Sequence, residues 1–288
     1  MKKIFHIMDS RQKHAGMTPQ KNVRTLIMGI LNVTPDSFSD GGKYLSPDKA
    51  VERVMEMIED GADIIDIGGE SSRPGAEAVS AEEEIKRVLP VICAIRKVSD
   101  IPISVDTCKS EVAEKVLSEG VDMINDITAL SDERMAGVIS ANGAGVVLMH
   151  MQGTPRTMQQ SPEYNDVIRD IYRYLEKAIR AAECAGISPE KIIVDPGIGF
   201  GKTLEHNLSI IADLFEFKKL KKTLLVGLSN KSFIGTLTGK KPDERSYGTV
   251  AANAAAILNG ADIVRVHDVK AAKDMVSVID GIKKAGWQ

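Results

Sequence analysis

Short, nearly continuous apolar runs alternate along the chain with longer segments whose apolar residues recur every three or four positions. Runs of the first kind are typical of parallel strands covered on both faces, and segments of the second kind are typical of amphipathic helices. We therefore predict eight strands, at residues 26–31, 63–67, 103–105, 123–125, 145–149, 192–194, 224–227 and 263–266.

The segments between the strands carry helix start and stop signals. Ser46 followed by Pro47 predicts a helix that begins there, because serine caps helix N-termini and proline fits the first helical position. Gly61 ends that helix, and Gly186 ends a longer one predicted over residues 165–185. Glycine adopts the left-handed conformation that lets a chain leave a helix and turn directly into a strand.

A weak internal repeat supports the same organisation. Four segments, 59–69, 118–127, 141–150 and 258–267, each pass from a helix end at glycine into a buried strand that ends in a polar residue. Eight strands in 288 residues leave an average of 36 residues per strand–helix unit, which suits a (β/α)8 TIM barrel. We predict one barrel domain over residues 26–288 with an N-terminal extension at 1–25. A doubly wound open sheet is the alternative.

One glycine-rich segment, PGIGFGKT at 196–203, invites a nucleotide-binding interpretation. A phosphate-binding loop requires glycine at the position that Pro196 occupies, and a dinucleotide fingerprint fails because Lys202 stands three residues after Gly199. We interpret the segment as a turn from a strand into a helix.

Composition is that of a soluble globular protein, with 43% hydrophobic residues, 27% charged residues and a formal net charge of −3. That charge gives no overall attraction to nucleic acid or to anionic membranes. The apolar runs are shorter than the roughly 20 residues of a membrane span, and the first 25 residues lack the apolar core of a secretory signal. Three widely spaced cysteines are typical of reduced thiols, so we expect a cytoplasmic protein.

Every predicted strand is followed by hydrogen-bonding groups, which a barrel would gather at one mouth. Carboxylate and amide groups at Asp106, Asn125 and Asp195 suit a flat heterocycle with adjacent N–H groups, because buried carboxylates need donors. Cationic groups suited to an anion follow other strands, at Arg73, Lys231, Arg265 and His267. We predict a pocket that holds a polar heterocycle inside the mouth and an anion near its rim.

These residues also have simpler structural interpretations. Asp106 could cap a helix at 108–117, Asn125 could link loops, and Arg265 could pair with a neighbouring carboxylate. His150 is expected to be a loop residue and His206 a surface residue. Joint placement after the strands favours the functional interpretation.

Two strand-to-helix connections, 32–44 and 68–80, are unusually long and rich in Gly, Pro, Ser or Asp. Loops of this kind over a barrel mouth often act as lids that keep water from a reactive intermediate.

At these residues the sequence resembles the dihydropteroate synthase family of folate biosynthesis. The resemblance rests on two long segments, GILNVTPDSFSDGG at 29–42 and DIIDIGGESSRPGA at 63–76. Five shorter segments follow in order: SVDT (104–107), NDI (125–127), DPGIGFGK (195–202), GLSNKSFIG (227–235) and RVHDV (265–269). The match extends from about residue 27 to residue 286.

The resemblance implies a transferase that joins 6-hydroxymethyl-7,8-dihydropterin pyrophosphate to p-aminobenzoate, giving 7,8-dihydropteroate and pyrophosphate, and that sulfonamides inhibit. It implies Mg²⁺ as cofactor, with Asn32 as its protein ligand, and a homodimer. The pterin contacts of the family fall on Asp106, Asn125, Met149, Asp195, Phe200, Gly227 and Lys231. The pyrophosphate contacts fall on Asn32, Arg73, Arg265 and His267, and the p-aminobenzoate contacts on Phe38, Pro74, Lys231 and Ser232.

The catalytic set that the resemblance implies is Asp106, Asp195, Lys231, Arg73 and Asp40, with Asp40 helping to close the p-aminobenzoate site. Loss of pyrophosphate would leave an SN1-like pterin cation, sheltered by the two long loops until the aryl amine attacks.

The sequence departs from the common family pattern at two positions. Ser72 stands where threonine is more frequent, and Asn230 stands where arginine is frequent, so a cation is lost at the rim.

Two alternatives remain beside the synthase. One is a pterin-binding methyltransferase barrel, which would leave both long segments unexplained. The other is a catalytically silent pterin-binding protein, which is disfavoured because the anion-binding set of Asn32, Arg73, Arg265 and His267 is complete.

Overall fold

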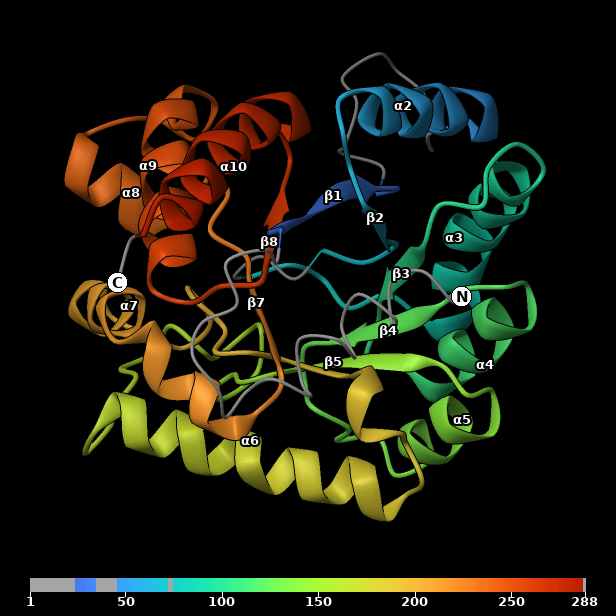
Figure 1. Ribbon diagram of the computed structural model, residues 1–288. Helices are drawn as coiled ribbons and strands as arrows, with labels where there is room; N and C mark the ends of the chain where they lie inside the picture. Colours follow the sequence, from blue (N-terminus) through green and yellow to red (C-terminus); the bar gives the residue numbers. More distant parts are fainter. Residues whose placement is uncertain (1–23, 35–45, 72–74, 287–288) are drawn as a thin grey trace.

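The computed structural model describes residues 24–34, 46–71 and 75–286 of the 288-residue chain. Within them, eight parallel strands form a closed barrel in sequence order, and the last strand pairs with the first. Helices follow the strands around the outside, as the progression of colours in Figure 1 shows. The (β/α)8 barrel is therefore confirmed, and the open sheet is excluded.

The observed strands begin and end within one residue of the predicted bounds. They are β1 (Leu26–Asn32), β2 (Ile64–Gly68), β3 (Ile103–Asp106), β4 (Met123–Asp126), β5 (Gly145–Met149), β6 (Ile192–Asp195), β7 (Thr223–Val226) and β8 (Ile263–Val266).

The described helices lie outside the barrel. They are α2 (Pro47–Glu59), α3 (Ala81–Arg96), α4 (Ser110–Ser118), α5 (Met135–Ala141), α6 (Val167–Cys184), α7 (Leu204–Ala212), α8 (Ser232–Thr238), α9 (Ser246–Leu258) and α10 (Val269–Lys284). Short 3-10 helices are η2 (Pro189–Lys191), η3 (Leu214–Leu220) and η4 (Pro242–Glu244).

Local sequence accounts for the helix ends. The Ser46 side chain accepts the backbone N–H of Lys49 and starts α2, and Gly61 follows the helix at φ +103°. The long helix α6 starts later than predicted because Asp166 is its N-cap and accepts the backbone N–H of Arg169. A carboxylate at that position also interacts favourably with the positive end of the helix dipole.

Two separate apolar cores hold the barrel together. The larger core lies between the strands and the helices. The smaller core fills the barrel interior and consists of Leu26, Met28, Ile64, Met123, Val147, Ile193, Leu225 and Ile263. Because side chains alternate between the faces of a strand, residues an even number of positions from these also face the interior. That alternation places the functional groups described below.

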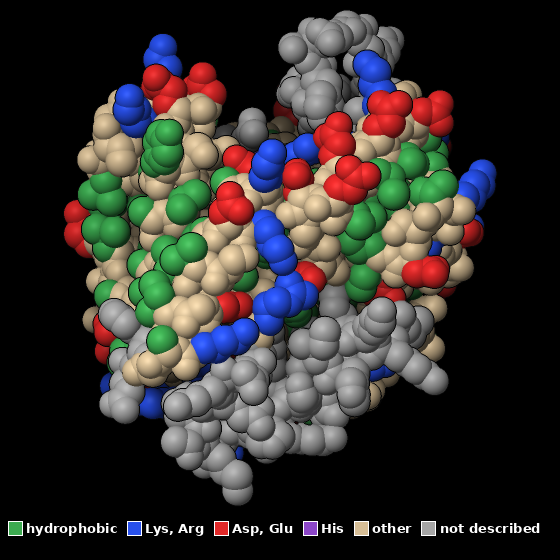
Figure 2. Space-filling view, turned by 45° about the horizontal axis from the view of Figure 1, so that its top comes forward, with side chains coloured by type: hydrophobic (Ala, Val, Ile, Leu, Met, Phe, Trp, Pro, Cys, Tyr) green, Lys and Arg blue, Asp and Glu red, His purple; other side chains and the backbone are tan. Residues whose placement is uncertain are grey.

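The described surface carries charges of both signs, and on the face shown in Figure 2 they are interspersed with apolar and neutral side chains. Among the described residues, no helix combines the length and the hydrophobicity of a membrane span.

Candidate functional site

The carboxyl-terminal mouth of the barrel holds a ring of polar side chains above the small interior core. Each lies two residues beyond an interior apolar residue on the same strand, so the pleat turns it inward. The pairs are Ile64 and Asp66 on β2, Met123 and Asn125 on β4, Ile193 and Asp195 on β6, and Ile263 and Arg265 on β8. The predicted convergence of strand-end polar residues is therefore observed for Asn125, Asp195 and Arg265.

Arg265 is the centre of a hydrogen-bonded network that spans the mouth. Its Nε donates to Asp66 Oδ2 at 2.6 Å, and its Nη2 donates to Asp106 Oδ2 at 2.9 Å. Burial opposes ionisation, but the carboxylates of Asp66 and Asp106 raise the pKa of Arg265 above its ordinary value. Arg265 does pair with neighbouring carboxylates, which was the simpler of its two interpretations.

Asp66 was not among the residues singled out from the sequence. Its side chain is fully buried, and its Oδ2 also accepts Asn125 Nδ2 at 3.2 Å, whereas its Oδ1 has no hydrogen-bond partner in the described structure. The sequence signal was available, since Asp66 lies two residues after the interior Ile64. It was missed because a single acidic residue inside an apolar run was interpreted as part of the strand.

The interpretation of Asp106 as a helix cap is wrong. Helix α4 begins at Ser110 and its N-cap is Lys109, while the Asp106 carboxylate faces Arg265. Burial raises the pKa of Asp106 to about 7, against the opposing effect of the nearby guanidinium. Burial disfavours the ionised form of Asp106, and hydrogen-bond donors stabilise that form. The carboxylate is therefore suited to bind a ligand rich in N–H groups.

Asp195 ends β6 in a similar environment. Its Oδ1 accepts the backbone N–H of Gly197 at 2.7 Å, and burial raises its pKa to about 6. The register pairs Asp195 with Met149, so an apolar side chain lies on the adjacent strand. The pair supplies an acceptor beside an apolar surface, as a flat heterocycle requires.

Lys231 and Phe200, which follow the neighbouring strands β7 and β6, contact each other. The Lys231 ammonium lies 4.0 Å from the centre of the Phe200 ring. Burial lowers the pKa of Lys231 to about 8, although the charge of Asp195 acts in the opposite direction. Gly227 directly follows β7, and a Cβ added to it would lie 3.9 Å from Arg265 Cβ, so the glycine lies beside the aliphatic part of the Arg265 side chain. Ser232 is the first residue of α8, directly after Lys231.

The glycine-rich segment forms the turn between β6 and α7, as predicted. A Cβ on Gly197 would overlap the carbonyl oxygen of His150, so this turn packs backbone against backbone on the turn after β5. Lys202 joins the two turns, since its buried Nζ lies 3.0 Å from His150 Nδ1 and donates to the Phe200 carbonyl at 2.9 Å. Burial lowers the pKa of His150 to about 3, and the positive charge of Lys202 acts in the same direction.

His150 and His206 therefore have structural roles that the sequence did not indicate. His150 is a buried partner of Lys202 rather than a simple loop residue. His206 is half-buried and, with Thr203, forms the capping box of α7. His206 is thus partly exposed, and its ring also contributes to the N-terminus of α7.

Two of the residues expected to bind an anion, His267 and Asn32, lie at the ends of their strands, at the rim. His267 follows β8, and its Nδ1 lies 2.9 Å from Ser229 Oγ. Asn32 ends β1, and its Oδ1 lies 3.5 Å from the position a Cβ on Gly68 would take. Gly68 therefore lies beside the amide oxygen of Asn32 at the mouth.

Asn32 can be tested against the needs of Mg²⁺. The ion prefers oxygen ligands and usually keeps several waters, binding through one or two protein oxygens together with substrate phosphates. No cluster of three or more His, Cys, Asp or Glu side chains suited to a metal occurs among the described residues. Asn32 offers one amide oxygen, which is a ligand type that Mg²⁺ accepts when phosphate oxygens and waters supply the rest.

The turn that carries Asn230 and Lys231 is supported by an arginine from elsewhere. Asn230 has a left-handed backbone at φ +58°, which asparagine tolerates. Arg245 Nη1 donates to the carbonyl of Asn230 at 2.9 Å and to that of Lys231 at 3.3 Å. A guanidinium is therefore present beside the position where the family often has arginine, and it holds the turn through the backbone.

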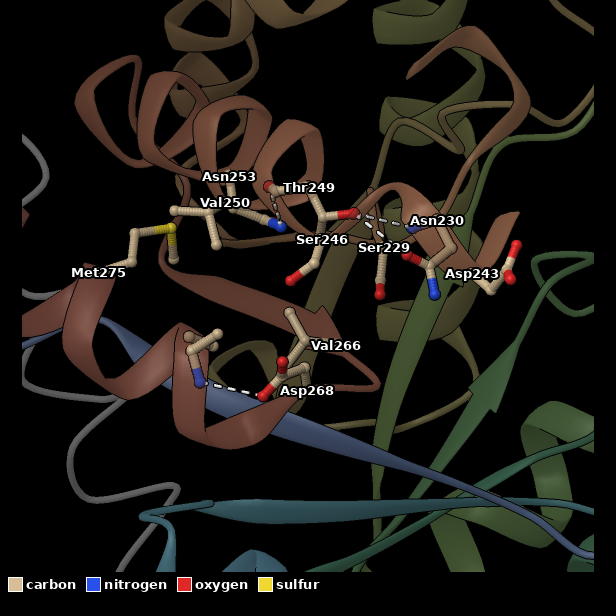
Figure 3. A pocket seen from close by; sticks show the side chains of 12 residues that line it. Ser229, Asn230, Asp243, Ser246, Thr249, Val250, Asn253, Val266, Asp268 and Met275 are labelled. Carbon is tan, nitrogen blue, oxygen red and sulfur yellow. Dashed lines mark hydrogen bonds between the residues drawn. The ribbon is translucent and has the colours of Figure 1, made fainter. Parts of the chain in front are cut away.

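A separate hollow of about 180 Å³ lies behind this turn, between α9 and α10 (Figure 3). Asn230, Thr249 and Asp268 are among the residues that line it. It does not contain Asp106, Asn125 or Asp195, so it is distinct from the barrel mouth.

Five residues expected at the site or beside it lie outside the described residues. They are Phe38, Asp40, Ser72, Arg73 and Pro74. Two further acidic residues that follow β2 or end β4 make local contacts. Glu70 pairs with Lys109, and Asp126 accepts the backbone N–H groups of Thr128 and Leu130. Both stabilise loops rather than the mouth.

The chain is similar to known proteins both in sequence and in fold. Residues 28–267 match the family described as pterin binding enzyme. The chain is 49% identical over 259 residues to the dihydropteroate synthase of Escherichia coli strain K12, covering 90% of this chain and 92% of that protein.

Solved structures agree. A Yersinia pestis dihydropteroate synthase, solved with a sulfonamide drug complex, superimposes with a TM-score of 0.87 at 44% identity, covering 91% of this chain and 95% of that one. A Xanthomonas albilineans dihydropteroate synthase with 4-aminobenzoic acid gives a TM-score of 0.85 at 44% identity, covering 90% and 93%.

Proposed function

Because this chain belongs to the pterin-binding family and, within it, to the dihydropteroate synthases, a family of transferases, we propose that it condenses hydroxymethyl-dihydropterin pyrophosphate with p-aminobenzoate. The products are dihydropteroate and pyrophosphate. The observation that carries the proposal is the convergence of Asp106, Asn125 and Asp195 at one barrel mouth, beside Lys231. The relatives solved with a sulfonamide drug complex and with 4-aminobenzoic acid support the same substrates.

Binding of the pterin ring follows from the donors and acceptors at the mouth. Asp106 and Asp195 accept N–H groups of the ring, and Asn125 offers both an acceptor and a donor. Met149 and Phe200 contact its faces, and Gly227 leaves space for its edge. The pKa values of Asp106 and Asp195 are raised because burial disfavours the ionised carboxylates. Hydrogen bonds from the N–H groups of a bound ligand stabilise these ionised forms.

The pyrophosphate end lies at the rim, where Asn32, Arg265 and His267 bind it together with Arg73. Asn32 would hold Mg²⁺ at this rim, and the ion would supply positive charge that stabilises the leaving group. The bond between the exocyclic carbon and oxygen breaks, and its electron pair leaves with pyrophosphate. The positive charge left on the carbon spreads into the pterin ring, beside the two carboxylates.

p-Aminobenzoate completes the reaction. Phe38, Pro74, Lys231 and Ser232 form its site, and the Lys231 ammonium suits its carboxylate. The amine nitrogen attacks the cationic carbon, a C–N bond forms, and the nitrogen loses a proton. Segments 32–44 and 68–80, with Asp40, exclude water during this step, because water would otherwise capture the cation.

Two further properties belong to the proposal. Sulfonamides compete with p-aminobenzoate, and the protein works in the cytoplasm as a homodimer. Light scattering on the purified protein measures the assembly, and a mass equal to the 31.2 kDa chain would exclude the dimer.

The activity is tested with purified protein, Mg²⁺ and both substrates, following pyrophosphate and dihydropteroate in the same reaction. Equal amounts of both products, formed only when both substrates are present, are expected. Pterin binding without either product would identify a silent pterin-binding protein instead.

A further inference from the structure

One buried carboxylate oxygen, Asp66 Oδ2, accepts hydrogen bonds from two different ligand-binding side chains. Arg265 Nε reaches it at 2.6 Å and Asn125 Nδ2 at 3.2 Å. The three residues lie on strands β8, β2 and β4, and 199 positions separate Arg265 from Asp66. The contact therefore ties a group expected to bind the anion to a group expected to bind the heterocycle.

The position of Asp66 is unfavourable unless it serves the site. Its side chain has no exposed surface, and its Oδ1 lacks a hydrogen-bond partner among the described residues. A buried carboxylate with an unpartnered oxygen destabilises a fold, and an apolar residue would fill the same space without that cost. Ile64, two residues earlier on β2, fills the interior layer below with an apolar side chain. Asp66 therefore lies at the level where the polar mouth of the barrel begins.

The guanidinium of Arg265 is held along one edge. The Nε and Nη2 groups, which share an edge of the planar fork, face Asp66 and Asp106. Two of the five N–H donors are used in this way, and the remaining edge, formed by Nη1 and the second hydrogen of Nη2, is suited to paired hydrogen bonds with a phosphate. The two carboxylates thus fix the direction in which the free edge points.

Asp66 also fixes the orientation of the Asn125 amide. An ionised carboxylate only accepts hydrogen bonds, so the amide must turn Nδ2 toward it. The amide oxygen and the second N–H of Asn125 then remain for another partner. With a neutral amide at position 66, either face of Asn125 could turn inward.

We propose that Asp66 is a positioning residue that orients Arg265 for the pyrophosphate and Asn125 for the pterin, so that one side chain aligns both halves of the substrate. The inference rests on the proposed function for the identity of the two ligands. Asp66 does not touch the reacting atoms and acts through its two partners.

The test uses Asp66→Asn, which keeps the shape and removes the charge. Affinities of the full-length protein for inorganic pyrophosphate with Mg²⁺ and for hydroxymethylpterin are measured separately by calorimetry. Both are expected to fall by about tenfold to a hundredfold, the equivalent of one charge-assisted hydrogen bond. The KM for p-aminobenzoate at saturating pterin substrate is expected to change less than threefold, since no described contact joins Asp66 to that site.

The matched control is Asp122→Asn at the opposite end of the barrel. Asp122 is also buried and accepts Arg96 Nη2 at 2.7 Å, so it is a structural aspartate–arginine pair. Its replacement is expected to lower the melting temperature and leave both affinities within threefold. Affinities of Asp66→Asn within threefold of wild type, or equal losses in both variants, would overturn the proposal.

A double variant separates positioning from general disturbance. If Asp66 acts through Arg265, Asp66→Asn should change pyrophosphate affinity less than threefold in an Arg265→Lys background. A further tenfold loss there would contradict the assignment. If Asp66→Asn does not fold, Asp66→Ser, which retains an oxygen acceptor, replaces it in both measurements. The binding experiments need no turnover, so they test the role of Asp66 independently of the activity. A wild-type protein that forms no dihydropteroate would refute the proposed function, and the binding experiments would still decide the role of Asp66.

Discussion

Replacement of Asp195 by asparagine should weaken pterin binding and stabilise the folded protein at the same time. Asp195 Oδ1 accepts the Gly197 N–H at 2.7 Å, and an asparagine oxygen can keep that bond. The new Nδ2 then takes the place of Oδ2, so a donor faces the N–H groups of the pterin.

The loss in binding can be worked from that exchange. One charge-assisted hydrogen bond contributes about 1.5–3 kcal/mol, and an unpaired buried donor costs about 1–3 kcal/mol. Together they amount to about 2.5–6 kcal/mol, which corresponds to about 10²- to 10⁴-fold in the dissociation constant.

The gain in stability follows from the pKa of Asp195, which burial raises from 3.8 to about 6. A carboxyl group with a raised pKa in the folded state favours folding while protonated, and this contribution is lost as the pH rises from 3.8 through about 6. At pH 8 the ionised group therefore costs the folded state about 3 kcal/mol. Asparagine removes that cost, although its neutral oxygen makes a slightly weaker hydrogen bond to the Gly197 N–H. The free energy of unfolding should therefore increase by about 1–3 kcal/mol.

Urea unfolding at pH 8 and pH 5 and calorimetric titration with hydroxymethylpterin measure both effects. The stability difference should shrink at pH 5, because less of the carboxyl group is then ionised. Asp280→Asn is the control, since this buried carboxylate accepts Thr25 instead of a ligand, and it should leave pterin affinity unchanged. Pterin affinity of Asp195→Asn within threefold of wild type, or lower stability than wild type at pH 8, would refute the reasoning.

Three further predictions concern pH, packing and metal. The ratio kcat/KM should rise between pH 5.5 and pH 7.5, as Asp195 and Asp106 lose protons with pKa values of about 6 and about 7. It should fall above about pH 8, as Lys231 loses its charge. A flat profile over pH 5–9 would exclude a role for these three groups in the reaction. Gly197→Ala should lower stability by about 2–4 kcal/mol in thermal unfolding, because its Cβ would overlap the His150 carbonyl; unchanged melting would contradict the described turn. Removal of Mg²⁺ by a chelator should abolish pyrophosphate release and leave hydroxymethylpterin binding within threefold; full activity without the metal would exclude the assigned role of Asn32.

The fold was accessible from the sequence because its strands are short apolar runs that end in polar residues at one mouth. β5 and β8 have the predicted bounds, and the others differ by one residue at either end. The connection between β7 and β8 was not resolved into elements in advance. It contains α8, η4 and α9, and neither α8 nor α9 has a side-chain hydrogen bond at its N-cap, so the usual start signal is missing.

The polar ring was predictable from strand alternation, but its internal pairing was not. Asn125 and Asp195 were expected at the mouth from their positions after apolar strands, and the structure places them there. The contact between Arg265 and Asp66 depends on barrel closure across 199 positions of sequence, and no local pattern specifies it. The contribution of Lys202 was missed for a similar reason, since its partner His150 lies on a different turn.

The most direct test is a crystal structure of the protein with hydroxymethylpterin, Mg²⁺ and inorganic pyrophosphate. The N–H edge of the pterin should lie on Asp106, Asn125 and Asp195, and pyrophosphate should lie on the free edge of Arg265. A pterin bound in the hollow between α9 and α10, or one whose N–H edge turns away from these three side chains, would contradict the assignment of the barrel mouth as the active site.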